Sequence, residues 1–159
     1  MSKQIFNPYR KVEGYNCFGC SPGNPIGLHL SFVEDGDEII SEWEPDKNYT
    51  GWIDVLHGGL QATMMDEIAS WVVFTKLRTA GVTREMTVKY RKSVLISDGK
   101  VICRARLTDV NRSLATIEVK LFSKEILRAE AKCVYYVFGE DEARDKFLYP
   151  GSDAFYCQT

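Results

Sequence analysis

The chain has 159 residues, of which 45% are hydrophobic, 26% charged and 12% aromatic, and its formal net charge is −2. This composition is typical of a single globular domain, and the nearly balanced charge argues against nucleic acid or an anionic membrane surface as the main partner. No apolar run reaches the roughly 18 residues that span a bilayer, and the N-terminus lacks the apolar core of a secretory signal. We therefore expect a cytoplasmic protein.

Residues 1–27 are rich in Gly, Pro, Asn and aromatic residues, which predicts an irregular N-terminal arm. The arm contains CFGC, which has the spacing of half a zinc site or of a redox pair. A second pair of ligands is absent from the sequence, whose only histidines are His29 and His57, and SPGNP follows where a redox motif would open a helix. We therefore interpret the five cysteines as free thiols, and we predict no metal and no cofactor.

The hydrophobic pattern of the remaining chain predicts an α+β fold. Residues 28–34 and 38–45 alternate apolar and polar side chains around a DGD turn, which predicts a hairpin, and a helix follows over about Gly58–Arg78. The period then changes to two, and this predicts four strands, at residues 83–94, 100–110, 113–123 and 125–138. We expect one antiparallel sheet wrapped around one long helix in a domain of residues 28–138, with residues 139–159 as a tail outside the core.

The predicted helix is apolar on two sides, yet it carries two adjacent acids, Asp66 and Glu67. Asp66 and Ser70 lie one turn apart on the same strip, whereas Glu67 points about a quarter-turn away. An acid among apolar residues is costly unless it is paired, hydrogen-bonded or functional. Asp66 is therefore either a catalytic candidate or a carboxylate on a solvated seam of the helix.

The start of the same helix is a candidate site for an oxyanion. Gly58 and Gly59 follow His57 and present bare backbone at the first turn. Their N–H groups, at the positive end of the helix dipole, can receive an oxyanion or a polarised carbonyl of the substrate. Asp66 lies two turns further on, which leaves space for a small acyl group or a water, particularly if the two groups come from different subunits.

HGGLQATMMDEIAS resembles the signature of hotdog-fold acyl-CoA thioesterases of the PaaI-like type, in which an acid follows the histidine of HGG by nine residues. The segments CFGCSPGNPIGLHLSF and AGVTREMTVKYRKSV also resemble parts of this family, so the resemblance covers about residues 17–138. It implies a hotdog fold and a homodimer joined edge to edge, with active sites at the dimer interface. Such dimers often pair again, and dimer and tetramer both stay open.

The resemblance also implies roles for individual residues. The N–H group of Gly58 binds the thioester carbonyl, and Asp66 acts as general base or nucleophile. Thr83 assists from the partner subunit, and Ser70 matches a second assisting position. His57 either shapes the site beside the carbonyl or is a satisfied loop histidine.

One position departs from the family pattern: some members carry an Asn or Gln where this chain has Gly51, and that amide holds the thioester or the water. Asn48 and Asp54 are alternative candidates for this task. CoA carries phosphates, so we expect basic residues at the entrance of the site. Basic residues on strands can also simply form a solvated face of the sheet. The candidates are Arg84, Lys89, Arg91, Lys92 and Arg112.

The leading hypothesis is an acyl-CoA thioesterase, because thioester hydrolysis needs only carbonyl-polarising donors and a carboxylate. The alternatives are an acyl-CoA-sensing module without turnover, a hotdog dehydratase or hydratase, and a purely structural oligomer. The combination of Asp66, Gly58 and Thr83 favours catalysis over sensing. The acyl group is open, since four large side chains could line a pocket or fill the core: Trp52, Met64, Met65 and Trp71.

Overall fold

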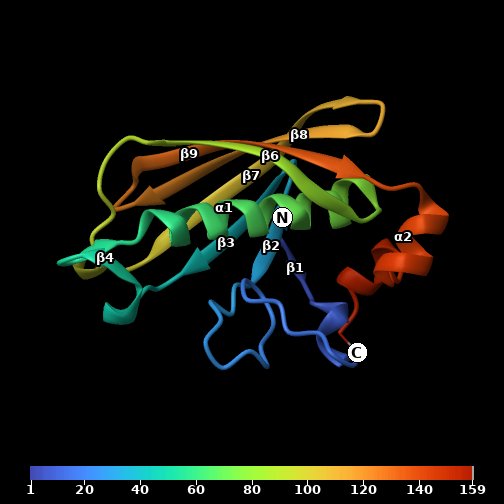
Figure 1. Ribbon diagram of the computed structural model, residues 1–159, viewed down its shortest axis with the longest axis horizontal. Coiled ribbons are helices and arrows are strands. Elements are labelled where there is room, and N and C mark those ends of the chain that lie inside the picture. Colours follow the sequence, from blue (N-terminus) through green and yellow to red (C-terminus); the bar gives the residue numbers. More distant parts are fainter. Residues whose placement is uncertain (159) are drawn as a thin grey trace.

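A computed structural model describes residues 1–158 of the chain. Within them, seven strands form one antiparallel sheet in the order β1-β2-β3-β7-β8-β9-β6, which curves around the helix α1 (Figure 1). A small ribbon of β4 (Thr50–Trp52) and β5 (Val55–Leu56) precedes the helix. The large sheet consists of β1 (Lys3–Ile5), β2 (Phe32–Asp35), β3 (Glu38–Trp43), β6 (Gly81–Tyr90), β7 (Val101–Asn111), β8 (Leu114–Ser123) and β9 (Ile126–Val137). The predicted α+β architecture is confirmed.

The predicted hairpin forms from β2 and β3, but its first strand begins later than the sequence pattern indicates. The N–H groups of Leu28 and Leu30 donate to the carbonyls of Phe18 and Gly19, at 2.9 Å each. These bonds hold the segment before β2 against the N-terminal arm instead of against a neighbouring strand. Strand pairing therefore starts only at Phe32.

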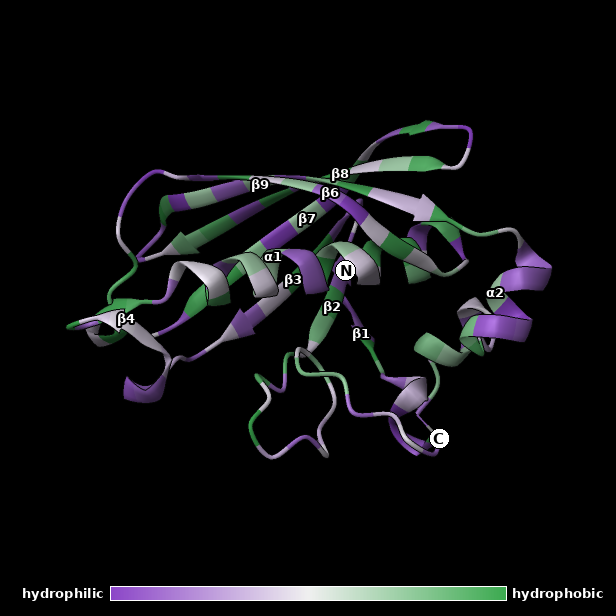
Figure 2. Cartoon of the chain, viewed as in Figure 1, coloured by the Kyte–Doolittle hydropathy of each residue, from purple (hydrophilic) through white to green (hydrophobic). Residues whose placement is uncertain are grey.

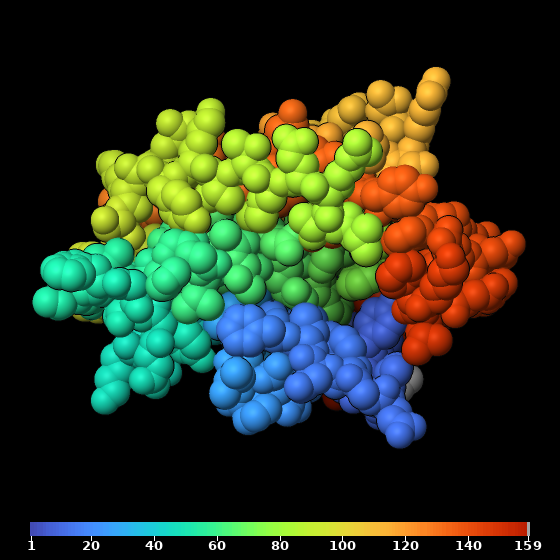
Figure 3. Space-filling model, in the orientation of Figure 1, coloured from blue at the N-terminus to red at the C-terminus, as the bar shows by residue number. Residues whose placement is uncertain are grey.

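The helix α1 (Gly58–Val72) continues as a π-helical turn over Val73–Leu77 and ends at Arg78, whose φ of 55° is left-handed. Most of its apolar side chains are buried against the sheet, including Met64, Met65 and Trp71, so three of the four large candidates belong to the core. Trp52, by contrast, is 73% exposed. One strip of the helix is visible between β6 and the N-terminal arm (Figure 3). No helix in the described part of the chain combines the length and the apolar character that a membrane span requires.

Both ends of the chain pack on the same core, which differs from the expected irregular arm and outlying tail. At the N-terminus, β1 pairs with β2 and Tyr9 is buried. At the C-terminus, α2 (Glu140–Phe147) is mostly hydrophilic (Figure 2), yet Ala143 and Phe155 are fully buried. The Tyr149 hydroxyl donates to the Phe74 carbonyl at 2.7 Å, so the tail is anchored on the end of α1. The prediction of a tail outside the core was wrong, because its few apolar residues are scattered in sequence and meet only in the fold.

The cysteines occupy two kinds of environment. All five are free thiols among the described residues. Cys103 on β7 and Cys133 on β9 are fully buried in the core, where an unpaired cysteine packs as a small hydrophobic residue. Cys17 and Cys20 instead lie in the arm beside α1, among polar groups.

Candidate active site

Asp66 lies half-buried on the exposed strip of α1 and faces the edge of the sheet. The Thr83 hydroxyl of β6 donates to Asp66 Oδ1 at 2.7 Å. The Tyr135 hydroxyl of β9 is 2.5 Å from the same oxygen and 2.7 Å from the Asp66 main-chain carbonyl. Thr83 and Tyr135 are directly opposite each other in the β6–β9 pair, so the sheet register brings both donors to one carboxylate.

Tyr135 was not among the residues expected in the site. Its side chain is only 2% exposed, and in the sequence it is indistinguishable from an inward-facing core residue of β9. Burial and the negative charge of Asp66 raise the pKa of Tyr135 above its usual range, so its hydroxyl keeps its proton and donates. Within one chain, the Thr83 hydroxyl already bonds the Asp66 carboxylate.

At the start of α1, the two glycines have different surroundings. His57 Nδ1 accepts a hydrogen bond from the Gly59 N–H at 2.9 Å and thereby caps the helix. The Tyr90 hydroxyl donates to the Gly58 carbonyl at 2.6 Å. Within residues 1–158, the Gly58 N–H makes no recorded hydrogen bond. The free donor of this turn is therefore Gly58, whereas the Gly59 N–H is occupied by a side chain of its own loop.

Gly51, the departure from the family pattern, packs against His57. A Cβ atom at this position would lie 3.2 Å from His57 Cα, which is closer than an ordinary contact. A side-chain amide here would thus require the histidine loop to move. Asp54 is engaged elsewhere, since its carboxylate accepts bonds from the backbone and hydroxyl of Ser97. Asn48 lies exposed in the loop before β4.

Ser70 shares the strip of Asp66, as the helix spacing predicts, but it does not contact the carboxylate. Its hydroxyl donates to the Glu67 carbonyl at 2.7 Å. Ser70 also lines a cavity of about 420 Å³ between α1, the N-terminal arm and the C-terminal segment. The Ser70 side chain therefore faces the cavity that Glu67 also lines, with its hydrogen directed to the backbone.

Glu67, the second acid of the helix, points into the N-terminal arm and away from the Asp66 site. Its two carboxylate oxygens lie 3.4 and 3.5 Å from Cys17 Sγ, and Trp71 Nε1 donates to one of them at 3.2 Å. Burial, followed by the charge of Cys17, raises the pKa of Glu67 to about 7. Interactions with Cys20 lower the pKa of Cys17 to about 5. The two acids of α1 thus lie in different environments: Asp66 contacts the sheet, whereas Glu67 contacts the N-terminal arm.

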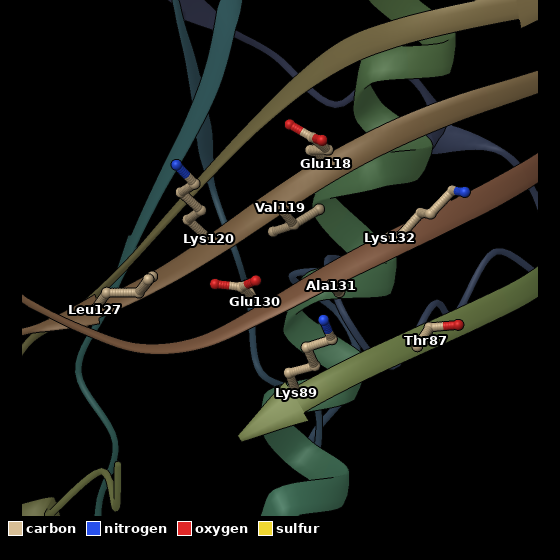
Figure 4. Close-up of a pocket in the computed structure, with 9 residues that line it drawn as sticks. All are labelled: Thr87, Lys89, Glu118, Val119, Lys120, Leu127, Glu130, Ala131 and Lys132. Atoms are coloured by element: carbon tan, nitrogen blue, oxygen red, sulfur yellow. The ribbon is translucent and has the colours of Figure 1, made fainter. Parts of the chain in front are cut away.

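The basic candidates for the CoA entrance are scattered over the molecule. Arg84 occupies the bulge of β6 beside Thr83, close to Asp66. Arg91 forms an ion pair with Glu130 at 3.1 Å. Lys89 lines a cavity of about 460 Å³ on the outer face of the sheet, where side chains point away from α1 (Figure 4). Two candidates remain, both exposed: Lys92, which follows β6, and Arg112, in the turn between β7 and β8.

A family model and several known proteins are similar to this chain. The family model of the thioesterase superfamily matches residues 54–130, the segment that contains Gly58, Asp66 and Thr83. Acyl-coenzyme A thioesterase 13 of mouse is 28% identical over 89 residues, which cover 55% of this chain and 63% of the mouse protein. The human protein of the same name is 31% identical over 88 residues, covering 55% and 62%. The matched segment thus spans less than two thirds of either relative.

Solved structures share the fold. A thioesterase superfamily protein superposes with a TM-score of 0.68 at 15% identity, over 76% of this chain and 59% of its own. A Streptococcus mutans protein bound to acetyl-CoA has a TM-score of 0.65 at 18% identity, over 81% and 97%. A sheet wrapped around one long helix, together with these superpositions, defines the hotdog fold. The segment of residues 54–130 is similar to the thioesterase superfamily.

Proposed function

We propose that the protein hydrolyses acyl-CoA thioesters to a free acid and CoA. The observation that carries this proposal is the Asp66 carboxylate, held by Thr83 and Tyr135 on the half-exposed strip of a helix whose first N–H is free. The names of the sequence relatives and the acetyl-CoA bound to the Streptococcus mutans protein support acyl-CoA as substrate. No metal or organic cofactor enters this chemistry.

The hydrogen bonds around Asp66 determine which of its oxygens is available for the reaction. Both side-chain donors, Thr83 and Tyr135, bond to Oδ1. Oδ2 has no recorded partner within residues 1–158, so it is the oxygen that takes a proton from water or attacks the thioester carbon. The Gly58 N–H stabilises the negative charge that develops on the carbonyl oxygen. If Oδ2 acts as general base, the water oxygen bonds to the carbonyl carbon, the C–S bond breaks, and the departing CoA thiolate takes the proton that Asp66 accepted. If Oδ2 attacks directly, an Asp66–acyl anhydride forms as the thiolate leaves, and water then hydrolyses it to the free acid and Asp66, with one water proton going to the thiolate.

The spacing of the two groups supports a site shared between two copies of the chain. Gly58 and Asp66 are eight residues apart on α1, which is roughly 12 Å along the helix axis. The two groups of one chain therefore cannot both act on a single carbonyl group. We place Gly58 of one subunit opposite Asp66 of the other, in a homodimer that pairs along the free edge of β6. A dimer of dimers can form from this unit.

The direct test is release of the CoA thiol from a panel of acyl-CoAs by wild type and Asp66→Asn. The expected loss of turnover in the variant is about 100-fold or more, the scale of a lost general base. An unchanged thermal unfolding midpoint shows that the loss is chemical. The best substrate of the panel identifies the acyl group.

The second candidate function is an acyl-CoA-binding module without turnover, and the glycine at position 51 favours it. Some members of the family hold the thioester or the water with an amide at this position, and here none is present. Binding of acyl-CoA by the wild type without any release of thiol would establish this function and overturn hydrolysis.

A further inference from the structure

Two cysteines of the N-terminal arm and the second acid of α1 form a cluster outside the Asp66 site. Cys17, Cys20 and Glu67 each place one ligand atom within 4.8 Å of the others. Cys20 is buried, and the other two residues are half-buried. The Glu67 carboxylate lies against Cys17 with both oxygens, at 3.4 and 3.5 Å from the sulfur. The cluster therefore combines two thiols and a carboxylate from segments far apart in the sequence.

The arm is shaped to receive this carboxylate. A Cβ atom at Gly19 would lie 2.6 Å from the Cδ and Oε2 atoms of Glu67, so only glycine at this position allows Glu67 between the two cysteines. The loop is also fixed from behind by the hydrogen bond from Leu30 to Gly19. The three donor atoms are thus held in place by the surrounding chain.

The distances and the donor types fit a zinc ion. With Zn–S of about 2.3 Å and Zn–O of about 2.0–2.2 Å, tetrahedral geometry separates sulfur and oxygen ligands by about 3.5 Å. The separations between the Cys17 sulfur and the Glu67 oxygens, 3.4 and 3.5 Å, agree with this value. We propose that Cys17, Cys20 and Glu67 bind one zinc ion, or a divalent ion of similar softness, per chain.

The groups around the cluster suit the ligands of such an ion. Trp71 Nε1 donates to Glu67 at 3.2 Å, and the Tyr15 hydroxyl lies 2.9 Å from Cys20 Sγ. Asn7 Nδ2 lies 3.9 Å from the same sulfur. Hydrogen bonds of this kind orient metal ligands and moderate the charge on thiolates. The polar surroundings of Cys17 and Cys20 contrast with the apolar ones of the two core cysteines on β7 and β9.

The fourth coordination position of the proposed ion opens toward solvent. Cys17, Cys20 and Glu67 all line the cavity of about 420 Å³ that also contains Ser70. Three protein ligands and one open position are typical of zinc sites that hold a water or a small ligand, whereas purely structural sites are closed by four side chains. The site is therefore expected to exchange its fourth ligand with molecules in the cavity.

The test is metal binding by the full-length, reduced protein after treatment with a chelator. We expect native mass spectrometry and calorimetric titration to show one zinc per chain. Cobalt substitution should produce thiolate charge-transfer absorption and the visible bands of a tetrahedral ion. Zinc should also raise the thermal unfolding midpoint, because it binds only the folded chain. These readouts are independent of thioester hydrolysis, so failure here leaves the Asp66 proposal untouched.

Substitutions assign the ligands. Glu67→Gln keeps the shape of the side chain but removes its charge, and we expect zinc affinity to fall at least about tenfold. Gly19→Ala displaces Glu67 by its new Cβ atom and should weaken zinc to a similar degree. Cys17→Ser should abolish stoichiometric binding, whereas Cys157→Ser, at an exposed cysteine outside the cluster, should leave it unchanged.

Two results would overturn the proposal. The first is a reduced, folded wild type that takes up neither zinc nor cobalt, which would make the cluster a hydrogen-bonded thiol–carboxylate group only. The second is ready formation of a Cys17–Cys20 disulfide under mild oxidation together with zinc affinity that Glu67→Gln leaves unchanged. That outcome would assign the pair to thiol–disulfide chemistry.

Discussion

At the scale of single residues, the Asp66 carboxylate is asymmetric because both of its side-chain donors bind Oδ1. Hydrogen bonds to a charged group contribute roughly 1.5–3 kcal/mol each, and they also fix the rotamer. The sheet thereby presents Oδ2 in a single orientation. In the proposed mechanism Thr83 and Tyr135 are positioning residues, since they act on the substrate only through Asp66.

Removal of the Tyr135 hydroxyl tests this role. We expect Tyr135→Phe to lower kcat about tenfold with little change in KM, since the phenyl ring fills the same space but no longer orients the carboxylate. Steady-state kinetics with the best acyl-CoA measures both constants. Tyr136→Phe is the matched control, because Tyr136 is the next residue of β9 and 42% exposed. Equal kinetics for the two variants would contradict a positioning role for Tyr135.

The sequence was informative for residues whose role follows from local spacing. Asp66 is conspicuous because it interrupts an apolar helix, and Gly58 because a helix start exposes free N–H groups. Tyr135 could not be distinguished, since alternation along β9 marks core and site residues alike. The sequence could not predict the partners of Glu67 either, because they depend on how an irregular arm of 27 residues folds back onto the helix.

At the scale of elements, the first turn of α1 supplies the proposed oxyanion donor, and proline can remove that donor selectively. Proline is well tolerated at the first helical position, and His57 already has the extended backbone (φ −56°, ψ 129°) that a following proline prefers. Gly58→Pro should lower kcat by about 100-fold or more. Gly58→Ala adds a Cβ atom but keeps the N–H, so it should lose much less activity.

For both Gly58 variants, release of the CoA thiol measures turnover, and far-UV circular dichroism shows whether the chain is folded. An active Gly58→Pro variant with a normal spectrum would exclude the Gly58 N–H as the oxyanion donor. In both variants the new Cβ atom lies 3.4 Å from the Tyr90 ring. The difference in activity between the two variants therefore does not come from this contact.

The sequence predicts a C-terminal segment outside the core, but the structure places it in the core. Its contribution to stability can therefore be measured. Phe155 is fully buried and stacks on Phe74 and Tyr149. We expect Phe155→Ala to lower the free energy of unfolding by about 3–5 kcal/mol. Leu148→Ala, at a residue 56% exposed, should change it by less than about 0.5 kcal/mol. Denaturant titration measures both; similar small losses would show that the segment contributes little.

Prediction of elements succeeded where the hydrophobic period was long and regular, as in α1 and strands β6 to β9. It failed for β1, which has only three residues and pairs with a strand 27 residues later. It failed also for the tail, where Ala143, Tyr149 and Phe155 follow no regular period. Such segments are specified by the surface they cover rather than by their own pattern.

At the scale of the whole molecule, the long free edge of β6 and the separation of Gly58 from Asp66 lead to a prediction about subunit sharing. A dimer of one Asp66→Asn chain and one Gly58→Pro chain contains one site with both groups intact and one with neither. Mixed dimers, isolated with two different tags, should recover about half of the wild-type activity, although each variant alone is inactive. Sites confined to single chains would give no recovery.

The hydrogen bond from the Phe6 N–H to the Phe155 carbonyl, at 2.7 Å, joins the first and last elements of the chain. During synthesis Phe6 leaves the ribosome well before Phe155, so this contact of the arm can form only after Phe155 has been made. In the meantime its cysteines are covered only by segments already made, Glu67 among them. The order of translation therefore allows the Cys17–Cys20–Glu67 cluster to assemble before Phe6 meets Phe155, and the proposed zinc ion would then bind before this contact adds its stability.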